Sequence, residues 1–500
     1  MYLALKWCAH YCRTGGKMEN TKQNVFSNLI WRFAERCGAQ IVQFVVSIVL
    51  ARVIAPEEYG TIALITVFTT IFQVFVDSGL GNALIQKKDT DDLDFSTVFY
   101  TNIVFCIILY IVIFLIAPAI ANFYNDNSLV ILIRVLSITI LISGIKNVQQ
   151  AYVSKKLMFR KFFWSTIGGT IAAAIIGIGL ALKGFGVWAL VAQQLTNLTI
   201  DTIILWITVK WRPKKQFSFQ RLKGLFSYGW KLLVSAVIDT TYNNIRSLII
   251  GKKYSSSDLA YYNKGNQFPN LIIQNVNNAI DSVLLPTMSN VQDNKEKVKA
   301  MTRKSIQVSV FIMAPLMMGL AFTSNNVIKL LLTEKWLPAV PYLCVFCITY
   351  MFYPIHTANL NALKAMGRSD LFLKLEIIKK IVGTILLLIT MNISVLAMAY
   401  SLIIECFMGQ IINSWPNKKI LNYSYINQMK DILPSIALAI AMGIIISIFN
   451  LLHISIVLTL MLQVIVGGVI YICCAKLLNL EAFNYLFDIV KGILKKKCEN

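Results

Sequence analysis

The chain has 500 residues, of which 57% are hydrophobic and 14% are charged, and its net charge is +23. This composition is typical of a chain that lies in lipid, and it excludes a protein folded around one aqueous core. A nucleic-acid partner is not expected, because the sequence has no soluble basic domain to bind one. Ten scattered cysteines and three distant histidines indicate neither a disulfide framework nor a metal site.

Fourteen apolar stretches fill the chain almost from end to end. Each is long enough to cross about 30 Å of hydrocarbon as a helix. The sequence therefore predicts an all-α polytopic membrane protein with about 14 transmembrane helices. The expected spans are 25–53, 60–80, 96–117, 128–149, 163–182, 187–208, 225–250, 259–290, 303–323, 338–363, 371–391, 393–413, 429–449 and 454–475.

Lysine and arginine are concentrated in alternate connections between these spans. The eight segments on one side hold 32 of them, whereas the seven connections on the other side hold 5. Positive charge in short connections is retained in the cytoplasm. We therefore expect both termini to be cytoplasmic.

A weak internal repeat has an offset near 200 residues, with 47–50 matching 247–250 and 81–85 matching 281–285. It predicts two six-helix lobes in the parallel-repeat plan of transporters, with the site between them. Met18 is a candidate for the true start. The expected organisation is a cytoplasmic amino terminus (1–24), a lobe of spans 1–6 (25–208), a basic cytoplasmic linker (209–224), a lobe of spans 7–12 (225–413), spans 13 and 14 (429–475) and an amphipathic cytoplasmic tail (476–500).

Polar side chains follow one face of several expected spans. The spacing of three or four residues places each set on one side of its helix. A charge at the helix centre costs about 2.5 to 3.5 kcal/mol, so it usually faces a bundle interior or water. The sets are Arg32, Arg36, Gln40, Gln43 and Ser47 in span 1; Thr66, Thr70, Gln73 and Asp77 in span 2; Lys231, Ser235, Asp239, Tyr242 and Arg246 in span 7; and Lys264, Gln267, Gln274, Asn278 and Asp281 in span 8.

Two interpretations of these faces stay open. They line a hydrated cavity, or they satisfy one another as hydrogen bonds between helices. A cavity with arginine and lysine suits a phosphate-bearing substrate, and its amides and hydroxyls suit a sugar. Lys146 lies near a cytoplasmic end, where its ammonium is expected to reach the interface.

Five segments carry a resemblance to a known family. They are 50–60 (LARVIAPEEYG), 77–82 (DSGLGN), 156–163 (KLMFRKFF), 184–190 (GFGVWAL) and 285–288 (LPTM). In this order across fourteen spans, the chain resembles the Wzx-type oligosaccharide-unit flippases of the multidrug/oligosaccharidyl-lipid/polysaccharide exporter superfamily. The resemblance covers residues 18 to about 476.

The resemblance implies a V-shaped pair of six-helix bundles, two extra carboxyl-terminal helices and alternating access. The implied substrate is a polyprenyl diphosphate-linked oligosaccharide, moved from the cytoplasmic to the outer leaflet for a cell-surface lipopolysaccharide or exopolysaccharide. The expected partners are this lipid-linked substrate, membrane lipids, and a polysaccharide polymerase with its chain-length proteins. Neither enzymatic activity nor a cofactor or metal is expected, although transport is a candidate for coupling to protons or Na⁺.

The resemblance also implies roles for individual residues. The diphosphate would be bound by Arg32, Arg36, Lys231, Arg246 and Lys264. The polar and sugar-binding part of the cavity would contain Gln40, Gln43, Gln73, Tyr242, Gln267 and Asn278. A separate hypothesis from the residues themselves is that Asp77, Asp239 and Asp281 couple transport to an ion, because pairing with a cation makes the pKa of a carboxylate depend on conformation. Their alternative role is to neutralise the neighbouring cations.

Two other functions compete with this one. A multidrug or organic cation antiporter shares the architecture, but it would favour an acidic, aromatic cavity over the cationic faces of spans 1, 7 and 8. A membrane-embedded glycan polymerase or ligase would need a large outer loop with catalytic groups. The longest expected outer connection, 324–337, is short.

Overall fold

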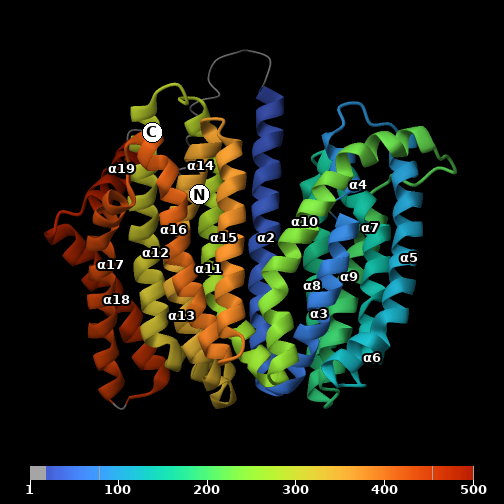
Figure 1. Cartoon of the computed structure of the whole chain (residues 1–500), viewed down its shortest axis with the longest axis horizontal. Coiled ribbons are helices and arrows are strands. Elements are labelled where there is room, and N and C mark those ends of the chain that lie inside the picture. Colours follow the sequence, from blue (N-terminus) through green and yellow to red (C-terminus); the bar gives the residue numbers. More distant parts are fainter. Residues whose placement is uncertain (1–18, 78, 453, 499–500) are drawn as a thin grey trace. The chain divides into compact units, whose positions relative to one another are not determined.

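The computed structural model describes the backbone of residues 19–77, 79–452 and 454–498, and most of their side chains. These residues form helices and no strand, which confirms the all-α class (Figure 1). They fall into two compact units, residues 19–260 and residues 261–498. The boundary lies within one helix, α11 (Ser256–Ser289).

The first unit contains nine helices that are complete within its described residues. They are α2 (Glu19–Val53), α3 (Pro56–Asp77), α4 (Leu80–Gln86), α5 (Asp92–Tyr124), α6 (Leu129–Leu136), α7 (Ile138–Lys155), α8 (Phe159–Leu182), α9 (Val187–Thr208) and α10 (Phe219–Lys253). In the second unit, α11 is followed by α12 (Lys295–Leu332), η1 (Glu334–Ala339), α13 (Val340–Met351), α14 (Tyr353–Ala365), α15 (Ser369–Thr390), α16 (Val395–Leu421), α17 (Tyr425–Ser447), η2 (Ile448–Leu452), α18 (Ile456–Leu477) and α19 (Glu481–Cys498).

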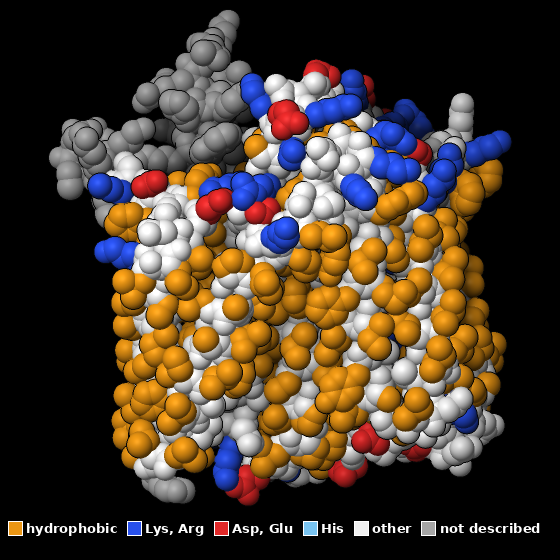
Figure 2. All heavy atoms as spheres, turned by 60° about the vertical axis from the view of Figure 1, so that its left-hand side comes forward, with side chains coloured by type: hydrophobic (Ala, Val, Ile, Leu, Met, Phe, Trp, Pro, Cys, Tyr) orange, Lys and Arg blue, Asp and Glu red, His pale blue; other side chains and the backbone are white. Residues whose placement is uncertain are grey.

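Each of the fourteen expected spans overlaps one or more of these helices. Eleven helical segments among the described residues are long and apolar enough to cross a membrane, and Figure 2 shows a broad band of hydrophobic side chains with lysine and arginine gathered at one end of it. The helices α10, α11 and α15 are long enough as well, but charged and amide side chains make them less apolar. The count of fourteen crossings therefore stays a prediction.

Four details differ from the sequence expectation. The expected span 128–149 is broken at Ser137, between α6 and α7. The span 338–363 is broken at Phe352, and Pro354 lies in the first turn of α14, a position that proline favours. The expected outer loop 324–337 is mostly helical, since α12 runs to Leu332 and η1 follows. Similarly, α4 occupies part of the expected connection 81–95.

In the first unit, α8 packs against α9 and α2, while α5 packs against α6 and α7. Gly169 of α8 lies against the α9 backbone, and a Cβ atom there would be 2.7 Å from the carbonyl oxygen of Asn197. Helix α10, which the sequence assigned to the second lobe, packs against α3, α4 and α5 of this unit. The expected lobe boundaries thus stay a prediction, and α10 is described with the first unit.

Two loops related by the internal repeat contact each other in this unit. The hydroxyl of Ser257 donates a hydrogen bond of 3.1 Å to Glu57 Oε1. A Cβ atom on Gly60 would lie 1.8 Å from the carbonyl oxygen of Ser256, so only glycine fits between these two helix starts. Each loop is also capped alike, since Glu58 accepts from the Ala55 N–H and Asp258 accepts from the Ser255 N–H.

In the second unit, α12 is the helix with most neighbours, and it packs against α13, α14, α17, α18 and α19. Arg303 of α12 forms a two-pronged ion pair with Asp431 of α17, with Nε 3.0 Å from both carboxylate oxygens. Arg303 also reaches Glu481 at 3.2 Å, and Tyr423 donates to Asp431 at 2.7 Å. These contacts fix the start of the tail helix α19 to the unit.

Candidate functional site

The polar face of α2 is accessible at the middle of a membrane-length helix. Arg36 lies at the midpoint of α2, and its side chain is exposed. Gln43 is also exposed, and Gln40 is half-buried. Arg36 has no carboxylate partner among the described side chains. Arg32 lies one turn earlier on α2, and its side chain is outside the described residues.

The polar face of α10 belongs to the same unit. Lys231 and Asp239 are exposed, whereas Tyr242 and Arg246 are half-buried. All four lie on a helix of 35 residues, and Lys231 and Asp239 lie on opposite sides of its midpoint. In the first unit, two membrane-length helices therefore carry exposed charged side chains in their middle turns.

Asp77 lies in a hydrogen-bonded network with amides. Gln73 Nε2 donates to Asp77 Oδ2 at 3.1 Å, and Asn147 Nδ2 donates to Asp77 Oδ1 at 3.3 Å. Asn102 of α5 then donates to Asn147 at 3.3 Å. The sequence predicted Gln73 and Asp77 on one face but missed Asn102 and Asn147, because their helices show no comparable polar spacing.

Lys146 forms an ion pair with Asp201 of α9, and both side chains are largely buried. The expectation that Lys146 reaches the membrane interface is therefore wrong in this structure. The cause is a carboxylate 55 residues further along the chain, which no local spacing could reveal. This buried pair lies beside the Asp77 network, since Asn147 follows Lys146 on α7.

The predicted residues of α11 lie in the second unit and differ in environment. Lys264 is buried, with Nζ 3.1 Å from Gln267 Oε1 and 5.6 Å from the ring centre of Trp336. Its role as a ligand of the diphosphate stays a prediction. Asn278 and Asp281 are exposed, and Asp281 accepts a hydrogen bond of 2.7 Å from Asn361.

A buried amide seam in the second unit was not predicted. Asn417 donates to Asn359 at 2.7 Å, and Asn359 and Gln428 exchange hydrogen bonds of 2.8 and 3.0 Å. Nearby, Asn413 contacts His356 at 3.0 Å. These hydrogen bonds join α14, α16 and α17.

The described residues contain no group of three His, Cys, Asp or Glu side chains that could hold a metal ion.

The fold matches those of two solved transporters. The structure superposes with a TM-score of 0.72 on "Lipid II flippase MurJ, inward closed conformation", at 15% identity, covering 92% of this chain and 100% of that one. A multidrug resistance MATE family transporter in an inward-facing conformation gives a TM-score of 0.60 at 14% identity, over 76% of this chain and 94% of that one.

The chain belongs to the polysaccharide biosynthesis protein family, whose model matches residues 49–341. It is 26% identical over 435 residues to "Teichuronic acid biosynthesis protein TuaB" of Bacillus subtilis. The aligned residues cover 86% of this chain and 89% of that protein. It is 24% identical over 363 residues to "Succinoglycan biosynthesis transport protein ExoT" of Rhizobium meliloti, covering 72% and 73%. The resemblance carried by the five sequence motifs is thereby confirmed at the level of the family.

Proposed function

We propose that this protein moves a polyprenyl diphosphate-linked oligosaccharide from the cytoplasmic to the outer leaflet of the membrane. The observation that carries this proposal is Arg36, an exposed arginine at the midpoint of α2. Arg36 lies within the expected span 25–53, near the start of its candidate membrane stretch Ala34–Val53, and a charge inside a span usually faces water or an anionic ligand rather than lipid. The family and the names of its relatives then favour a lipid-linked precursor of a polysaccharide.

The chemistry of the two polar helices suits such a substrate. The guanidinium of Arg36 can bind two phosphate oxygens at once, which a lysine ammonium cannot do with the same geometry. Lys231 on α10 supplies a second exposed cation, and Gln43 supplies an amide for sugar hydroxyls. In this proposal the diphosphate pairs with these cations, the sugars remain in a hydrated space and the polyprenyl tail stays in lipid.

Ion coupling is part of the proposal and involves Asp77, Asp239 and Asp281. Asp77 and Asp281 accept amide hydrogen bonds from other helices, at 3.3 Å from Asn147 and 2.7 Å from Asn361. A rearrangement of those helices would change the number of donors around each carboxylate, and with it the balance between its charged and neutral forms. Protons or Na⁺ would then favour one conformation over another.

The proposed setting is a bacterial cytoplasmic membrane with both chain termini on the cytoplasmic side. The basic connections support this orientation, because 32 lysines and arginines lie on one side and 5 on the other. A polymerase and its chain-length proteins would receive the translocated lipid-linked oligosaccharide on the outer face. The protein itself would act without a cofactor.

The test is the sidedness of the lipid-linked oligosaccharide in cells depleted of the protein. We expect it to accumulate in the cytoplasmic leaflet, out of reach of a membrane-impermeant glycosidase. Wild type should restore access, and Arg36→Gln should restore it at least about tenfold less well, since loss of a charge-assisted hydrogen bond removes roughly 1.5–3 kcal/mol. Arg36→Lys should give an intermediate result.

Lys183→Gln is the matched control, because Lys183 is an exposed basic residue at the end of α8, away from both polar faces. It should behave as wild type at equal membrane abundance. Unchanged sidedness with loss of polymer would contradict transport and favour polymerisation. Normal glycan together with new sensitivity to organic cations would favour a drug exporter.

A further inference from the structure

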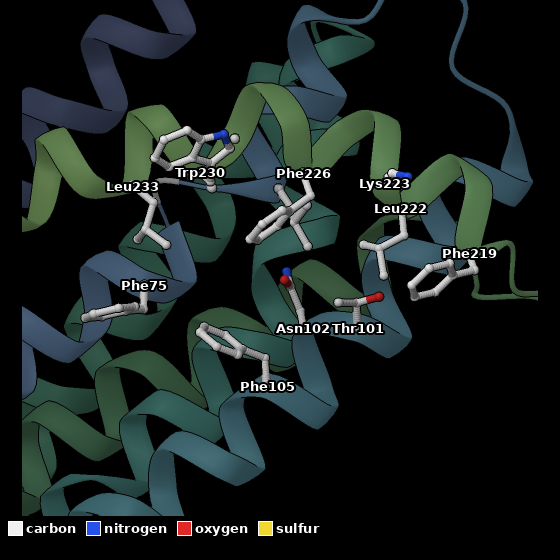
Figure 3. Close-up of a pocket in the computed structure, with 13 residues that line it drawn as sticks. Phe75, Thr101, Asn102, Phe105, Phe219, Leu222, Lys223, Phe226, Trp230 and Leu233 are labelled. Atoms are coloured by element: carbon white, nitrogen blue, oxygen red, sulfur yellow. The ribbon is translucent and has the colours of Figure 1, made fainter.

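A cavity of about 420 Å³ lies within the first unit, between α10 and α5. One wall is a stripe on α10 with spacings of three and four residues, formed by Phe219, Leu222, Phe226, Trp230 and Leu233. Figure 3 shows Leu222 and Phe226 pointing from α10 toward Thr101 and Asn102 of α5, and Leu233 pointing toward Phe75 of α3. The α3 residue Phe75 completes the apolar lining, so the cavity is an aromatic groove.

The groove is accessible from outside the unit. Phe219 is 72% exposed, Phe226 is 54% exposed and Trp230 is 45% exposed, although all three line it. A Cβ atom on Gly229 would lie 3.0 Å from the carbonyl oxygen of Gly79, so α10 and the break between α3 and α4 meet there. The amide nitrogen of Asn102, on the opposite wall, donates to Asn147. The remaining surface of the groove is largely hydrocarbon.

A cation lines the groove near the start of α10. Lys223 belongs to the lining, and within the described part of the chain no carboxylate pairs with it. Two other basic side chains of this segment are engaged, since Lys214 pairs with Asp92 at 2.6 Å and Arg221 lies 3.4 Å from Asp91. An apolar groove with one available ammonium at its basic end is complementary to an amphiphile with an anionic group.

We propose that, before translocation, this groove holds the phosphate-proximal part of a polyprenyl chain with its phosphate at Lys223, from which the diphosphate then passes to Arg36 and Lys231. The inference rests on the proposed function, because it assigns the lipid tail of the same substrate to a place on the first unit. The groove is one cavity of about 420 Å³, and we assign it to one hydrocarbon chain rather than to the two chains of a glycerophospholipid. Burial of each methylene from water contributes about 0.8 kcal/mol, and flat aromatic rings present large contact areas at low entropic cost.

Photolabelling of the purified full-length protein in phosphatidylcholine nanodiscs tests the groove directly. The probe is undecaprenyl phosphate with a diazirine near the phosphate. We expect label in the peptide 219–233, displaced by unlabelled undecaprenyl phosphate but not by dioleoyl phosphatidylglycerol. The double variant Phe226→Ala/Trp230→Ala should label about tenfold less, because it removes the two rings from the lining.

Lys223→Gln is the milder second variant, and it should lower labelling about threefold by removing the ammonium without opening the groove. Trp188→Ala is the matched control, because Trp188 is also a tryptophan of the first unit, 40% exposed, and does not line the cavity. Its labelling should equal that of wild type. All variants are compared only as monodisperse protein.

Three results would overturn the groove proposal. They are labelling elsewhere than 219–233, displacement by phosphatidylglycerol as effective as by undecaprenyl phosphate, and unchanged labelling in both groove variants. Leaflet sidedness in cells separates this failure from failure of the proposed function. If cells flip the lipid-linked oligosaccharide and the groove is not labelled, only the groove assignment is wrong. If the groove is labelled and sidedness is unaffected by depletion, the flippase assignment is wrong.

Discussion

Lys146 on α7 and Asp201 on α9 form an ion pair inside the first unit, with 12% and 9% of their side chains exposed. An unpaired charge at such a place is strongly unfavourable, whereas a pair replaced by apolar side chains of similar size is often tolerated. The pair joins α7 to α9, and it lies beside the hydrogen-bonded network that contains Asp77.

Removal of one partner should be more harmful than removal of both. We expect Lys146→Met to lower the free energy of unfolding by about 3–5 kcal/mol, because it leaves Asp201 buried without its partner. The double variant Lys146→Met/Asp201→Leu should recover most of that loss. Thermal unfolding in detergent, followed by size-exclusion fluorescence, measures the difference. A double variant as unstable as the sum of the two single variants would contradict the pairing.

Two glycines on α8 provide a matched test of helix packing. Gly169→Ala should destabilise the protein by about 1–3 kcal/mol, because its Cβ atom would lie 2.7 Å from the Asn197 carbonyl oxygen and 3.0 Å from the Cβ atom of Asp201. Gly179 has no atom within 4 Å of an added Cβ atom. Gly179→Ala should therefore be neutral or stabilising by up to about 1 kcal/mol. Equal melting temperatures for the two variants would show that α8 and α9 are not so closely packed.

The start of α5 should depend on pH through Asp91. Its carboxylate accepts a hydrogen bond of 2.9 Å from the Asp94 N–H. That bond, helped by the charge of Arg221, holds the pKa of Asp91 below its usual value. A carboxyl whose folded pKa is lowered stabilises the fold above its unfolded pKa, and the contribution is lost as pH falls through the folded pKa.

Asp91→Ala should cost about 0.5–2 kcal/mol at neutral pH, mainly through loss of the helix cap, since solvent screens this exposed charge. Asp91→Asn keeps a capping oxygen, so its stability at neutral pH should be close to that of wild type. Below about pH 3.9 its stability should fall by less than that of wild type, because asparagine has no carboxyl group to protonate. Melting temperatures measured across this range give the comparison. The same acid sensitivity in Asp91→Asn and wild type would exclude Asp91 as its source.

The tail helix α19 should loosen when the carboxylate that holds Arg303 is lost. In Asp431→Asn, Arg303 and Tyr423 lose their charged partner, which we expect to cost about 1.5–3 kcal/mol. Limited proteolysis between α18 and α19 should be several times faster. Asp370→Asn is the control, because its two-pronged pair with Arg368 has both side chains about half exposed and such pairs contribute about 0–1 kcal/mol. Equal cleavage rates in the two variants would contradict the role of Asp431.

The membrane class and the positions of the helices could be predicted because apolar stretches and basic connections are local patterns. The expected span 187–208 has the same bounds as α9, and the other expected spans differ from their helices mainly at the ends. Breaks such as Ser137 and Phe352 were missed because each span was identified from its hydrophobicity as a whole, which does not show a break of one residue, although Pro354 marks the second break. Helical periodicity also predicted the polar faces of α2 and α10.

Contacts between distant helices could not be predicted in the same way. The spacing around Lys146 gives no sign of Asp201, and the expected lobes gave no reason to place α10 against α3, α4 and α5. The faces of α10 are a clear example. One face carries the predicted Lys231 and Asp239, while another carries Phe226 and Trp230, which periodicity alone classifies as ordinary lipid-facing residues.

The contact between Glu57 and Ser257 is consistent with an origin of the chain by duplication. The two residues are 200 positions apart, the same offset as the internal repeat, and both belong to loops capped by an acidic residue in the same way. Equivalent positions of two identical chains meet when those chains form a symmetric dimer about a two-fold axis. A pair of half-length ancestors joined at this loop, later fused into one gene, would leave this contact as the trace of their interface.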